Sequence, residues 1–241
     1  MEIVINPKYR FLHKYLEHIS EHFADGEPVQ QSFNEIRVLR TGDLTLTVKR
    51  YGRSLTHRLK FYKTAKGKRA FLGQRLLRER GYESPEPVAF VRYRRNLLTA
   101  DTYFVTVRSP LRHILSDLSP FSESERQDIV TAFAAYTKRL HEDGFIHHNY
   151  KSKHVIFDRA ASGEGWRFAL IDVNRVHRRR KGVSVERGLK GLARITFDDD
   201  SLFLLLVDEY VRLRAFNPDE ARRIATEAHT AYQNKVARRG R

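Results

Sequence analysis

The sequence contains no cysteine among its 241 residues. Disulfide bridges, cysteine-ligated zinc, iron–sulfur clusters and thiol nucleophiles are therefore excluded, and a reducing compartment suits the chain. Long apolar runs are also missing: the longest, Leu202 to Val207, has six residues, whereas a membrane-spanning helix needs about 20. The first residues, Met1 to Asn6, lack the basic and apolar regions of an export signal. We expect no transmembrane segment, and a cytoplasmic protein that is at most peripheral at the inner face of the cell membrane.

Acidic residues are scarce relative to basic ones. Lys and Arg number 45 against 29 Asp and Glu, which gives a formal net charge of +16. Such a charge favours polyanionic partners: nucleic acid, an anionic lipid surface or a phosphorylated small molecule. No aromatic-basic recognition motif or helix-turn-helix signature accompanies the charge, so we rank nucleic acid last. A solvated basic surface explains part of the excess in any case.

The secondary-structure signal changes once along the chain. Roughly the first 108 residues are strand-rich with one helix, which we expect from about Leu55 to Arg80 with Gly81 as its C-terminal cap. Period-two alternation predicts the first two strands, with a turn at Gly42, and apolar content predicts two more joined by a basic turn at residues 94–96. The expected strands are Ile36–Val38, Leu44–Lys49, Val88–Arg92 and Asp101–Val107.

The second part of the sequence reads as mostly helical. Ser122 and Glu125 have the spacing of a capping box, and the stripe of apolar residues that follows has helical spacing: Ile129, Phe133, Tyr136 and Leu140. Two short strands are expected at residues 154–157 and 167–171, and Asn217 with Pro218 begins the last helix. We therefore predict an α+β fold of two lobes. A small antiparallel sheet lobe with one helix spans residues 1–108, and a larger, mainly helical lobe spans residues 109–241.

Three segments contain residues that could carry chemistry. Lys49 shares one face of its strand with Thr45 and Thr47, so its ammonium can point into a cleft and neutralise phosphate charge. Most strand lysines are merely solvated, so this signal alone is weak. The polar run from His147 to His154 follows the striped helix, and Asp172 ends an apolar strand. A strand-end carboxylate suits Mg²⁺, which prefers oxygen ligands.

The order of these segments resembles a known family. The chain is similar to the Kdo/heptose lipopolysaccharide kinase family, whose members have a bilobal protein-kinase-like fold, over roughly Glu35 to Ile195. The stretches that carry the resemblance are, in chain order, LTVKRY, GYESPEPVAFV, LHEDGFIHHNYKSKHVIFD, FALIDVNRVHRRR and VERGLKGLARI. Each motif is weak by itself, and the ordered set is specific.

The resemblance implies roles for individual residues. Lys49 would contact the phosphates of ATP, and Asp172 would bind Mg²⁺. The catalytic candidates on the loop are His147, Asn149 and Lys151, and His154 joins Lys49 and Asp172 as a nucleotide-side candidate. The basic cluster Arg178 to Lys181 would lie where a phosphorylated sugar-lipid is met, although a solvated charge run explains it equally well. The three loop histidines do not make a metal site, since adjacent histidines point in different directions.

The chain also departs from the pattern of the family. Asn149 stands where the catalytic loop usually has aspartate, and an amide can orient a hydroxyl but cannot act as a base. His154 stands where kinases usually have a metal-holding asparagine. No helix glutamate is found to pair with Lys49, since the equivalent position falls near Leu72 with Gln74 the closest polar residue. No glycine-rich phosphate loop precedes Lys49.

Two functions remain in competition at this point. The first is an ATP- and Mg²⁺-dependent phosphotransferase with weakened catalysis, acting on a Kdo or heptose sugar of the lipopolysaccharide inner core. A general base contributes only about 10²–10⁴ to the rate, and phosphoryl transfer depends mainly on positioning and charge. We prefer this function narrowly, because Lys49 and Asp172 are both present. The alternative is a pseudokinase that serves as a scaffold or regulator without turnover.

Overall fold

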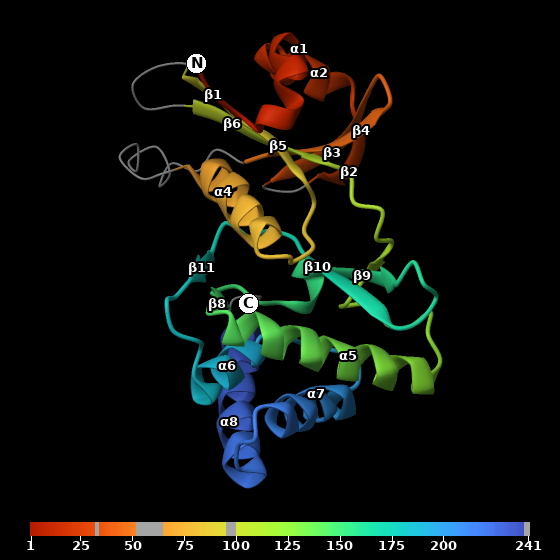
Figure 1. Cartoon of the computed structure of the whole chain (residues 1–241), viewed down its shortest axis with the longest axis vertical. Helices are drawn as coiled ribbons and strands as arrows, with labels where there is room; N and C mark the ends of the chain where they lie inside the picture. Colours follow the sequence, from red (N-terminus) through yellow and green to blue (C-terminus); the bar gives the residue numbers. More distant parts are fainter. Residues whose placement is uncertain (32–33, 52–64, 95–99, 239–241) are drawn as a thin grey trace. The chain divides into compact units, whose positions relative to one another are not determined.

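The computed structural model describes residues 1–31, 34–51, 65–94 and 100–238. The chain forms two compact units (Figure 1). Unit 1 comprises Met1–Pro110 together with the short segment Asp172–Asn174, and unit 2 comprises Leu111–Ile171 and Arg175–Arg241. Asp172 therefore belongs by its contacts to the unit that is built from the beginning of the chain. Asp172 follows Ile171 of unit 2 in the chain, but it is grouped with the residues of unit 1.

Unit 1 is built on a six-stranded sheet in which every pair of neighbours is antiparallel. The strand order across the sheet is β1-β5-β6-β4-β3-β2. The strands are β1 (Glu2–Ile5), β2 (Glu27–Gln31), β3 (Glu35–Thr41), β4 (Leu44–Arg50), β5 (Pro87–Arg94) and β6 (Ala100–Val107). The helices are the 3₁₀-helix η1 (Pro7–Leu12), α1 (His13–Glu17), α2 (Ile19–Asp25) and α4 (Lys66–Glu79).

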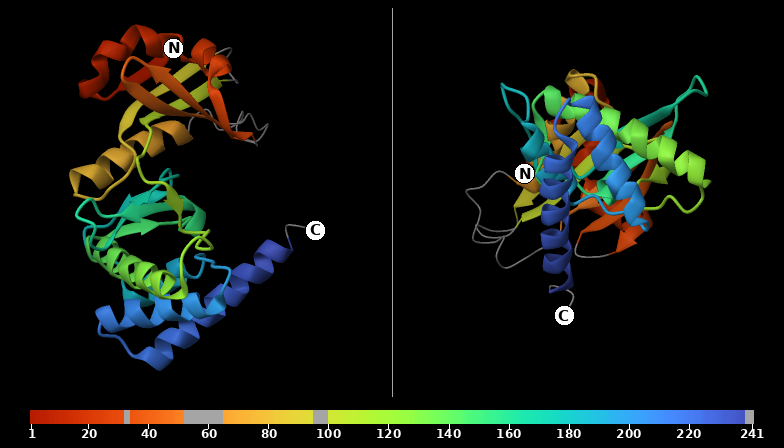
Figure 2. Two further views of the ribbon diagram at one scale, coloured as in Figure 1. Left: turned by 90° about the vertical axis from the view of Figure 1, so that its right-hand side faces the viewer. Right: turned by 90° about the horizontal axis from the view of Figure 1, so that it is seen from below.

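The sheet of unit 1 buries both of its faces, because side chains alternate along each strand. Leu46, Val48 and Val105 pack with the apolar residues of η1, α1 and α2. Phe90 and Phe104 point to the opposite face and pack with α4. The ribbon shows α1 and α2 on one side of the sheet and α4 on the other (Figures 1 and 2). Residues that alternate with Leu46 and Val48 therefore lie on the α4 side.

The four predicted strands and the end of the predicted helix are confirmed in unit 1. Gly42 turns the β3–β4 hairpin with a φ of 53°, and Gly81 has a φ of 76° directly after α4. The Tyr82 N–H donates to the Leu77 carbonyl at 3.0 Å, which closes the helix end as a glycine cap does. The start of the predicted helix at residues 55–64, and most of the basic turn after Arg94, lie outside the described residues.

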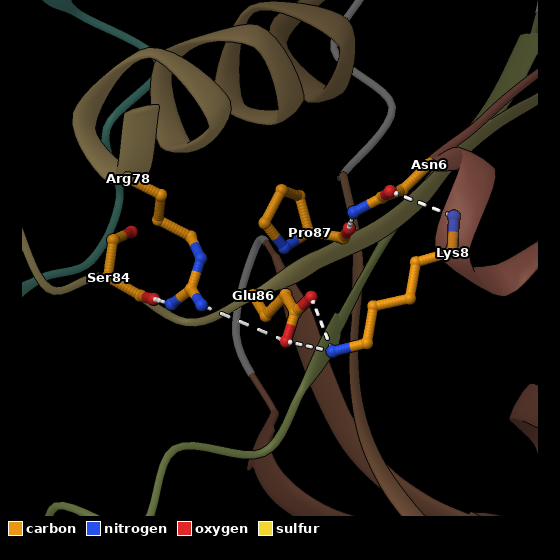
Figure 3. Close-up of polar contacts among 6 residues, drawn as sticks. All are labelled: Asn6, Lys8, Arg78, Ser84, Glu86 and Pro87. Carbon is orange, nitrogen blue, oxygen red and sulfur yellow. Dashed lines mark hydrogen bonds and ion pairs between the residues drawn. The ribbon is translucent and has the colours of Figure 1, made fainter. Parts of the chain in front are cut away.

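The segment before β3 was not predicted as helical, and the structure adds η1, α1 and α2 there. Polar contacts hold the beginning of this segment to the chain that enters β5 (Figure 3). Asn6 Nδ2 donates to the Pro87 carbonyl at 2.9 Å, and Lys8 Nζ lies 3.0 Å from Glu86 Oε1. Glu86 also faces Arg78 of α4, with an Nη2–Oε2 distance of 3.8 Å. One carboxylate thus connects the N-terminal segment with the end of α4.

Unit 2 contains two small sheets and several helices. The sheets have the orders β10-β9-β7 and β11-β8, and all pairs are antiparallel. The strands are β7 (His113–Ile114), β8 (Phe145–His147), β9 (Val155–Arg159), β10 (Trp166–Leu170) and β11 (Val176–Arg178). The helices are α5 (Glu123–Glu142), the 3₁₀-helix η2 (Ser152–His154), α6 (Val185–Leu192), α7 (Asp200–Leu213) and α8 (Pro218–Ala237).

The core of unit 2 forms around α5. Ser122 and Glu125 form the predicted capping box, and the four residues of the apolar stripe are all buried. Helix α5 lies against α7 and β10, while α8 packs on α6 and α7 (Figures 1 and 2). Asn217 caps α8 as expected, since its side chain accepts from the Glu220 N–H. The predicted α+β class is therefore confirmed. In the described part of the chain, no helix has both the length and the apolar composition needed to cross a bilayer.

Candidate active site

Lys49 lies in the middle of the unit 1 sheet, near the end of β4. Its backbone is paired with Ile36 on β3 and with Phe104 on β6. Phe104 packs against α4, so the Lys49 side chain lies on the α4 side of the sheet. There its ammonium Nζ lies 2.8 Å from Asp172 Oδ1. Only 18% of the Lys49 side chain and 23% of the Asp172 side chain are exposed. This ion pair is therefore shielded from water far more than an ordinary surface pair.

Asp172 has an unusual backbone. Its φ is 56°, in the left-handed region that few residues other than glycine adopt. Asn174 helps to fix this conformation, since its Nδ2 donates to the same Oδ1 of Asp172 at 2.8 Å. Backbone strain of this kind costs about 1–3 kcal/mol and is found mostly where geometry serves a function. The strained turn directs the carboxylate to Lys49.

Helix α4 contacts the segment after Asp172 through the main chain. A Cβ on Gly73 would lie 2.8 Å from the Val173 carbonyl oxygen, so only glycine permits this approach. Arg69 Nε donates to the Asn174 carbonyl at 3.3 Å. The only carboxylate within α4 is Glu79, which pairs with Arg75. Gln74 is 3% exposed, and its Oε1 has no hydrogen-bond partner in the described structure. The carboxylate beside Lys49 is therefore that of Asp172 and does not come from α4.

Tyr51 completes this part of the site. Its ring lies 5.2 Å from Lys49 Nζ, a cation–π distance. Its hydroxyl is buried without a hydrogen-bond partner in the described structure. Burial, and secondly the negative charge of Asp172, raise the pKa of the Tyr51 hydroxyl far above its usual value. Tyr51 is therefore a neutral phenol at all physiological pH values.

The loop after β8 lies in unit 2 and is held by two imidazoles. The Asn149 N–H donates to His147 Nδ1 at 3.1 Å, and His154 Nδ1 donates to the Asn149 carbonyl at 2.9 Å. The two rings are nearly parallel, with centroids 6.0 Å apart. Both histidines are buried, whereas Asn149 is partly exposed. The two histidines thus fix the main chain on either side of Asn149.

The other candidate residues of unit 2 have different partners. Lys151 Nζ lies 5.6 Å from the ring of Tyr232 on α8, so its ammonium is directed at that helix. The Ile171 N–H donates to the His154 carbonyl at 2.9 Å, which joins the loop to the chain immediately before Asp172. Arg178 donates from Nε to the Asp143 carbonyl at 3.2 Å. The side chains from Arg178 to Lys181 are all exposed.

Comparison with known proteins identifies the family. A family model described as "Lipopolysaccharide kinase (Kdo/WaaP) family" matches residues 32–202, which is most of the chain. The chain belongs to this family. A solved structure entitled "WaaP in complex with acyl carrier protein" is similar with a TM-score of 0.64 and 17% sequence identity, and the similarity covers 99% of both chains. At this identity the likeness shows the fold alone, and it confirms the predicted fold class. No curated protein matches in sequence.

The residues of this Kdo/WaaP family member suit a magnesium–nucleotide in unit 1 better than a metal ion on the loop. Lys49 and Asp172 bring an ammonium and a carboxylate oxygen together, which are the groups that bind phosphate and Mg²⁺. His147 and His154 instead use their Nδ1 atoms on the Asn149 main chain. Among the described residues, no three His, Cys, Asp or Glu side chains gather as a metal site would require.

Sequence reasoning did not find every residue around Lys49 and Asp172. It missed Tyr51, Arg69, Gly73 and Asn174. Asn174 could have been suspected, since it lies two positions after the strand-end carboxylate. Tyr51 and Gly73 have no sequence signal of this kind, because one is an aromatic residue after a strand and the other a glycine within a helix. Their importance follows from the packing of α4 on the segment after Asp172.

Proposed function

We propose that this Kdo/WaaP family member transfers the γ-phosphoryl group of ATP to a hydroxyl of a lipopolysaccharide inner-core sugar, Kdo or heptose. The observation that carries the proposal is the ion pair between Lys49 and Asp172, which are 123 positions apart in the chain. Removing two charges from water costs free energy that their attraction need not offset, so a partly buried pair is weak evidence for a role in stability alone. In a family of lipopolysaccharide kinases, such a pair would hold a nucleotide.

The residues of unit 1 would bind the nucleotide. The Lys49 ammonium would exchange part of its contact with Asp172 for phosphate oxygens, and the Asp172 carboxylate would hold Mg²⁺. When bound, Mg²⁺ neutralises the charge that develops on the phosphates during transfer. Asn174 donates to Asp172 Oδ1 and so keeps the carboxylate in place while Lys49 moves. Gly73 and Arg69 hold the backbone of the same segment.

Asn149 would orient the hydroxyl of the acceptor but would not take its proton. An amide has no basic oxygen, so the proton must leave to solvent or to the transferred phosphate. His147 and His154 position Asn149 through its N–H and carbonyl. Without a carboxylate base, turnover should be slower by about 10²–10⁴ than with aspartate at this position. The missing carboxylate at Asn149 would therefore weaken catalysis.

A pseudokinase is the second candidate, and Asn149 is the observation that favours it. In this case the fold and nucleotide binding would persist without transfer, and the protein would act as a scaffold or regulator. The two candidates agree on Lys49 and Asp172 and differ only in turnover. A direct measurement of transfer therefore separates them.

The acceptor would be an anionic glycolipid at the inner face of the cell membrane. The formal charge of +16 supports this partner, since basic residues near an anionic lipid surface each contribute about 1 kcal/mol to binding. With no helix suited to crossing a bilayer among the described residues, such an attachment would be peripheral.

The test is transfer of label from ATP, labelled in its γ-phosphate, to deacylated core oligosaccharide. Wild type should label the oligosaccharide slowly and only with Mg²⁺, whereas Asp172→Ala should not label it. Lys138→Ala is a suitable control, because Lys138 forms a partly exposed pair with Glu142 within α5. No transfer by wild type, combined with intact nucleotide binding, would favour the pseudokinase.

A further inference from the structure

A group of five basic side chains surrounds the beginning of the loop in unit 2. The group, which we call the His148 cluster, consists of His148, Arg175, His177, Arg187 and Arg194. The His148 N–H donates to the Arg175 carbonyl at 3.1 Å, so the loop and the start of β11 are joined there. His177 lies on β11 opposite Ile146 of β8, and its ring centroid is 5.3 Å from that of His148.

Helix α6 contributes the other two members of the His148 cluster. The Ser184 side chain caps this helix and accepts from the N–H of Arg187, which therefore lies in the first turn. Arg194 follows the helix end and donates from Nη1 to the His148 carbonyl at 2.6 Å. Three separate segments thus bring their basic side chains to one place. Four of the five members are exposed, and Arg194 is partly exposed.

The electrostatic environment of His148 indicates that the other members of the cluster lie close to its imidazole. Burial lowers the pKa of the His148 imidazole, and the positive charges of His177, Arg187, Arg194 and Arg175 lower it further, in that order. Each of the four is therefore near enough to repel a proton on His148.

The His148 cluster gathers basic side chains that have no counter-charge among the described residues. Several arginines elsewhere in unit 2 are instead paired with carboxylates: Arg112 with Asp158, Arg159 with Glu125, Arg212 with Glu209 and Arg222 with Asp208. In the part of the chain that the structure describes, no carboxylate pairs with any of the five cluster members. Gathering like charges without partners opposes folding, so a bound anion explains the arrangement.

We propose that the His148 cluster binds a phosphomonoester of the acceptor glycolipid. The proposal rests on the proposed function, since it names the part of the acceptor that this enzyme recognises. Guanidinium groups present paired N–H donors that match phosphate oxygens, and they bind more strongly than neutral donors do. His148 directly precedes Asn149 in the chain. An acceptor held by the cluster therefore lies beside the loop that orients its hydroxyl.

The experiment measures binding of deacylated core oligosaccharide that retains its phosphates, by calorimetry with the full chain. The test variant is the double substitution Arg175→Gln with Arg187→Gln, which leaves the main-chain contact of Arg194 intact. The matched control is Arg212→Gln with Arg222→Gln, which removes the same net charge from exposed arginines of unit 2. Two further arms use the same oligosaccharide after phosphatase treatment, and inorganic phosphate alone.

The proposal predicts that Kd for the phosphorylated oligosaccharide rises at least ten-fold in the test variant and less than two-fold in the control. Phosphatase treatment should weaken binding to wild type by a similar factor, and inorganic phosphate should bind more weakly than the oligosaccharide. Equal losses in both variants would show general attraction by net charge and would overturn the proposal. Undiminished binding after phosphatase treatment would also overturn it, as would inorganic phosphate that binds as tightly as the oligosaccharide.

Nucleotide binding distinguishes failure of this proposal from failure of the proposed function. The test variant should keep the thermal stabilisation that Mg²⁺ and ATP give to wild type, because its substitutions lie in unit 2 and spare Lys49 and Asp172. Stabilisation by ATP in wild type, with unchanged oligosaccharide binding in the test variant, would remove the cluster proposal alone. Absence of that stabilisation in wild type would remove the kinase proposal whatever the cluster does.

Discussion

Lys49 and Asp172 form an ion pair with an Nζ–Oδ1 distance of 2.8 Å, although 123 positions separate them in the chain. Asp172 reaches this position through a left-handed backbone conformation. Asn174 and the close approach of α4 support that conformation. The pair is thus the product of several parts of unit 1, and substitutions in any of them should affect it in distinguishable ways.

Restoring a carboxylate on the loop should raise the rate of transfer. The variant Asn149→Asp places a proton acceptor where the amide can only orient the hydroxyl, so kcat should rise by about 10²–10⁴ with little change in KM for ATP. The hydrogen bonds of Asn149 with His147 and His154 involve its main chain and survive the substitution. Steady-state transfer to oligosaccharide tests this, and a variant as slow as wild type would argue against the assigned role of Asn149.

Gly73→Ala should disturb Asp172 from a distance. The new Cβ would lie 2.8 Å from the Val173 carbonyl oxygen, so α4 or the segment after Asp172 must shift, at a cost of about 1–3 kcal/mol. KM for ATP should rise together with the midpoint of Mg²⁺ activation. Gly191→Ala is the matched control, because nothing lies within 4 Å of its added Cβ, and replacing glycine in a helix stabilises by about 0.5–1 kcal/mol. Similar stability and ATP affinity in the two variants would contradict the tight contact.

Two buried tyrosines should respond in opposite ways to loss of the hydroxyl. The Tyr51 hydroxyl has no hydrogen-bond partner in the described structure, so Tyr51→Phe should leave the free energy of unfolding unchanged or raise it. The Tyr150 hydroxyl lies 2.9 Å from that of Thr137, and Tyr150→Phe should lower the free energy of unfolding by about 1 kcal/mol. Urea unfolding of both variants measures the two free energies and tests this prediction. A larger loss for Tyr51→Phe would show that its hydroxyl is bonded in solution.

His141 should make unit 2 less stable in acid. This imidazole is 2% exposed, and its Nδ1 accepts from the Tyr210 hydroxyl at 2.9 Å, which in turn accepts from Arg214 at 3.0 Å. Burial, and secondly the charge of Arg214, lower the pKa of His141 from 6.5 to about 3. Between these values the unfolded chain binds a proton that the folded chain does not, so stability falls as pH decreases from about 6.5 toward 3.

The contribution of His141 to this slope is about 1 kcal/mol per pH unit, and urea midpoints between pH 6 and 5 can detect it. His141→Gln keeps an acceptor for Tyr210 and should reduce the slope by that amount. As a second measurement that needs no variant, the wild-type imidazole should show no titration by NMR above pH 4. Titration near pH 6.5 would contradict the buried, neutral state.

Sequence patterns predicted the regular elements well where one periodicity extended over several residues. The β3–β4 hairpin and the stripe on α5 are examples, since each buries one face and therefore alternates clearly. The helices before β2 were missed, because α1 and α2 are short and their buried residues, such as Leu16 and Ile19, are too few to define a period.

The sequence identified individual residues of the candidate site but did not predict the contact between them. Lys49 and Asp172 were identified by their positions at strand ends and by family resemblance, but their contact depends on the positive φ of Asp172. Aspartate adopts that conformation only occasionally, so the residue type alone does not predict it. The His148 cluster was not predicted for a similar reason: its members come from the loop, β11 and α6, and only tertiary structure brings them together.

The most direct test of the central claim is the change in melting temperature that ATP produces with and without Mg²⁺. Wild type should be stabilised by millimolar ATP only when Mg²⁺ is present. Lys49→Ala and Asp172→Ala should each abolish the shift, while Lys138→Ala should preserve it. A shift that survives in both site variants, or no shift in wild type, would contradict a nucleotide site built on Lys49 and Asp172.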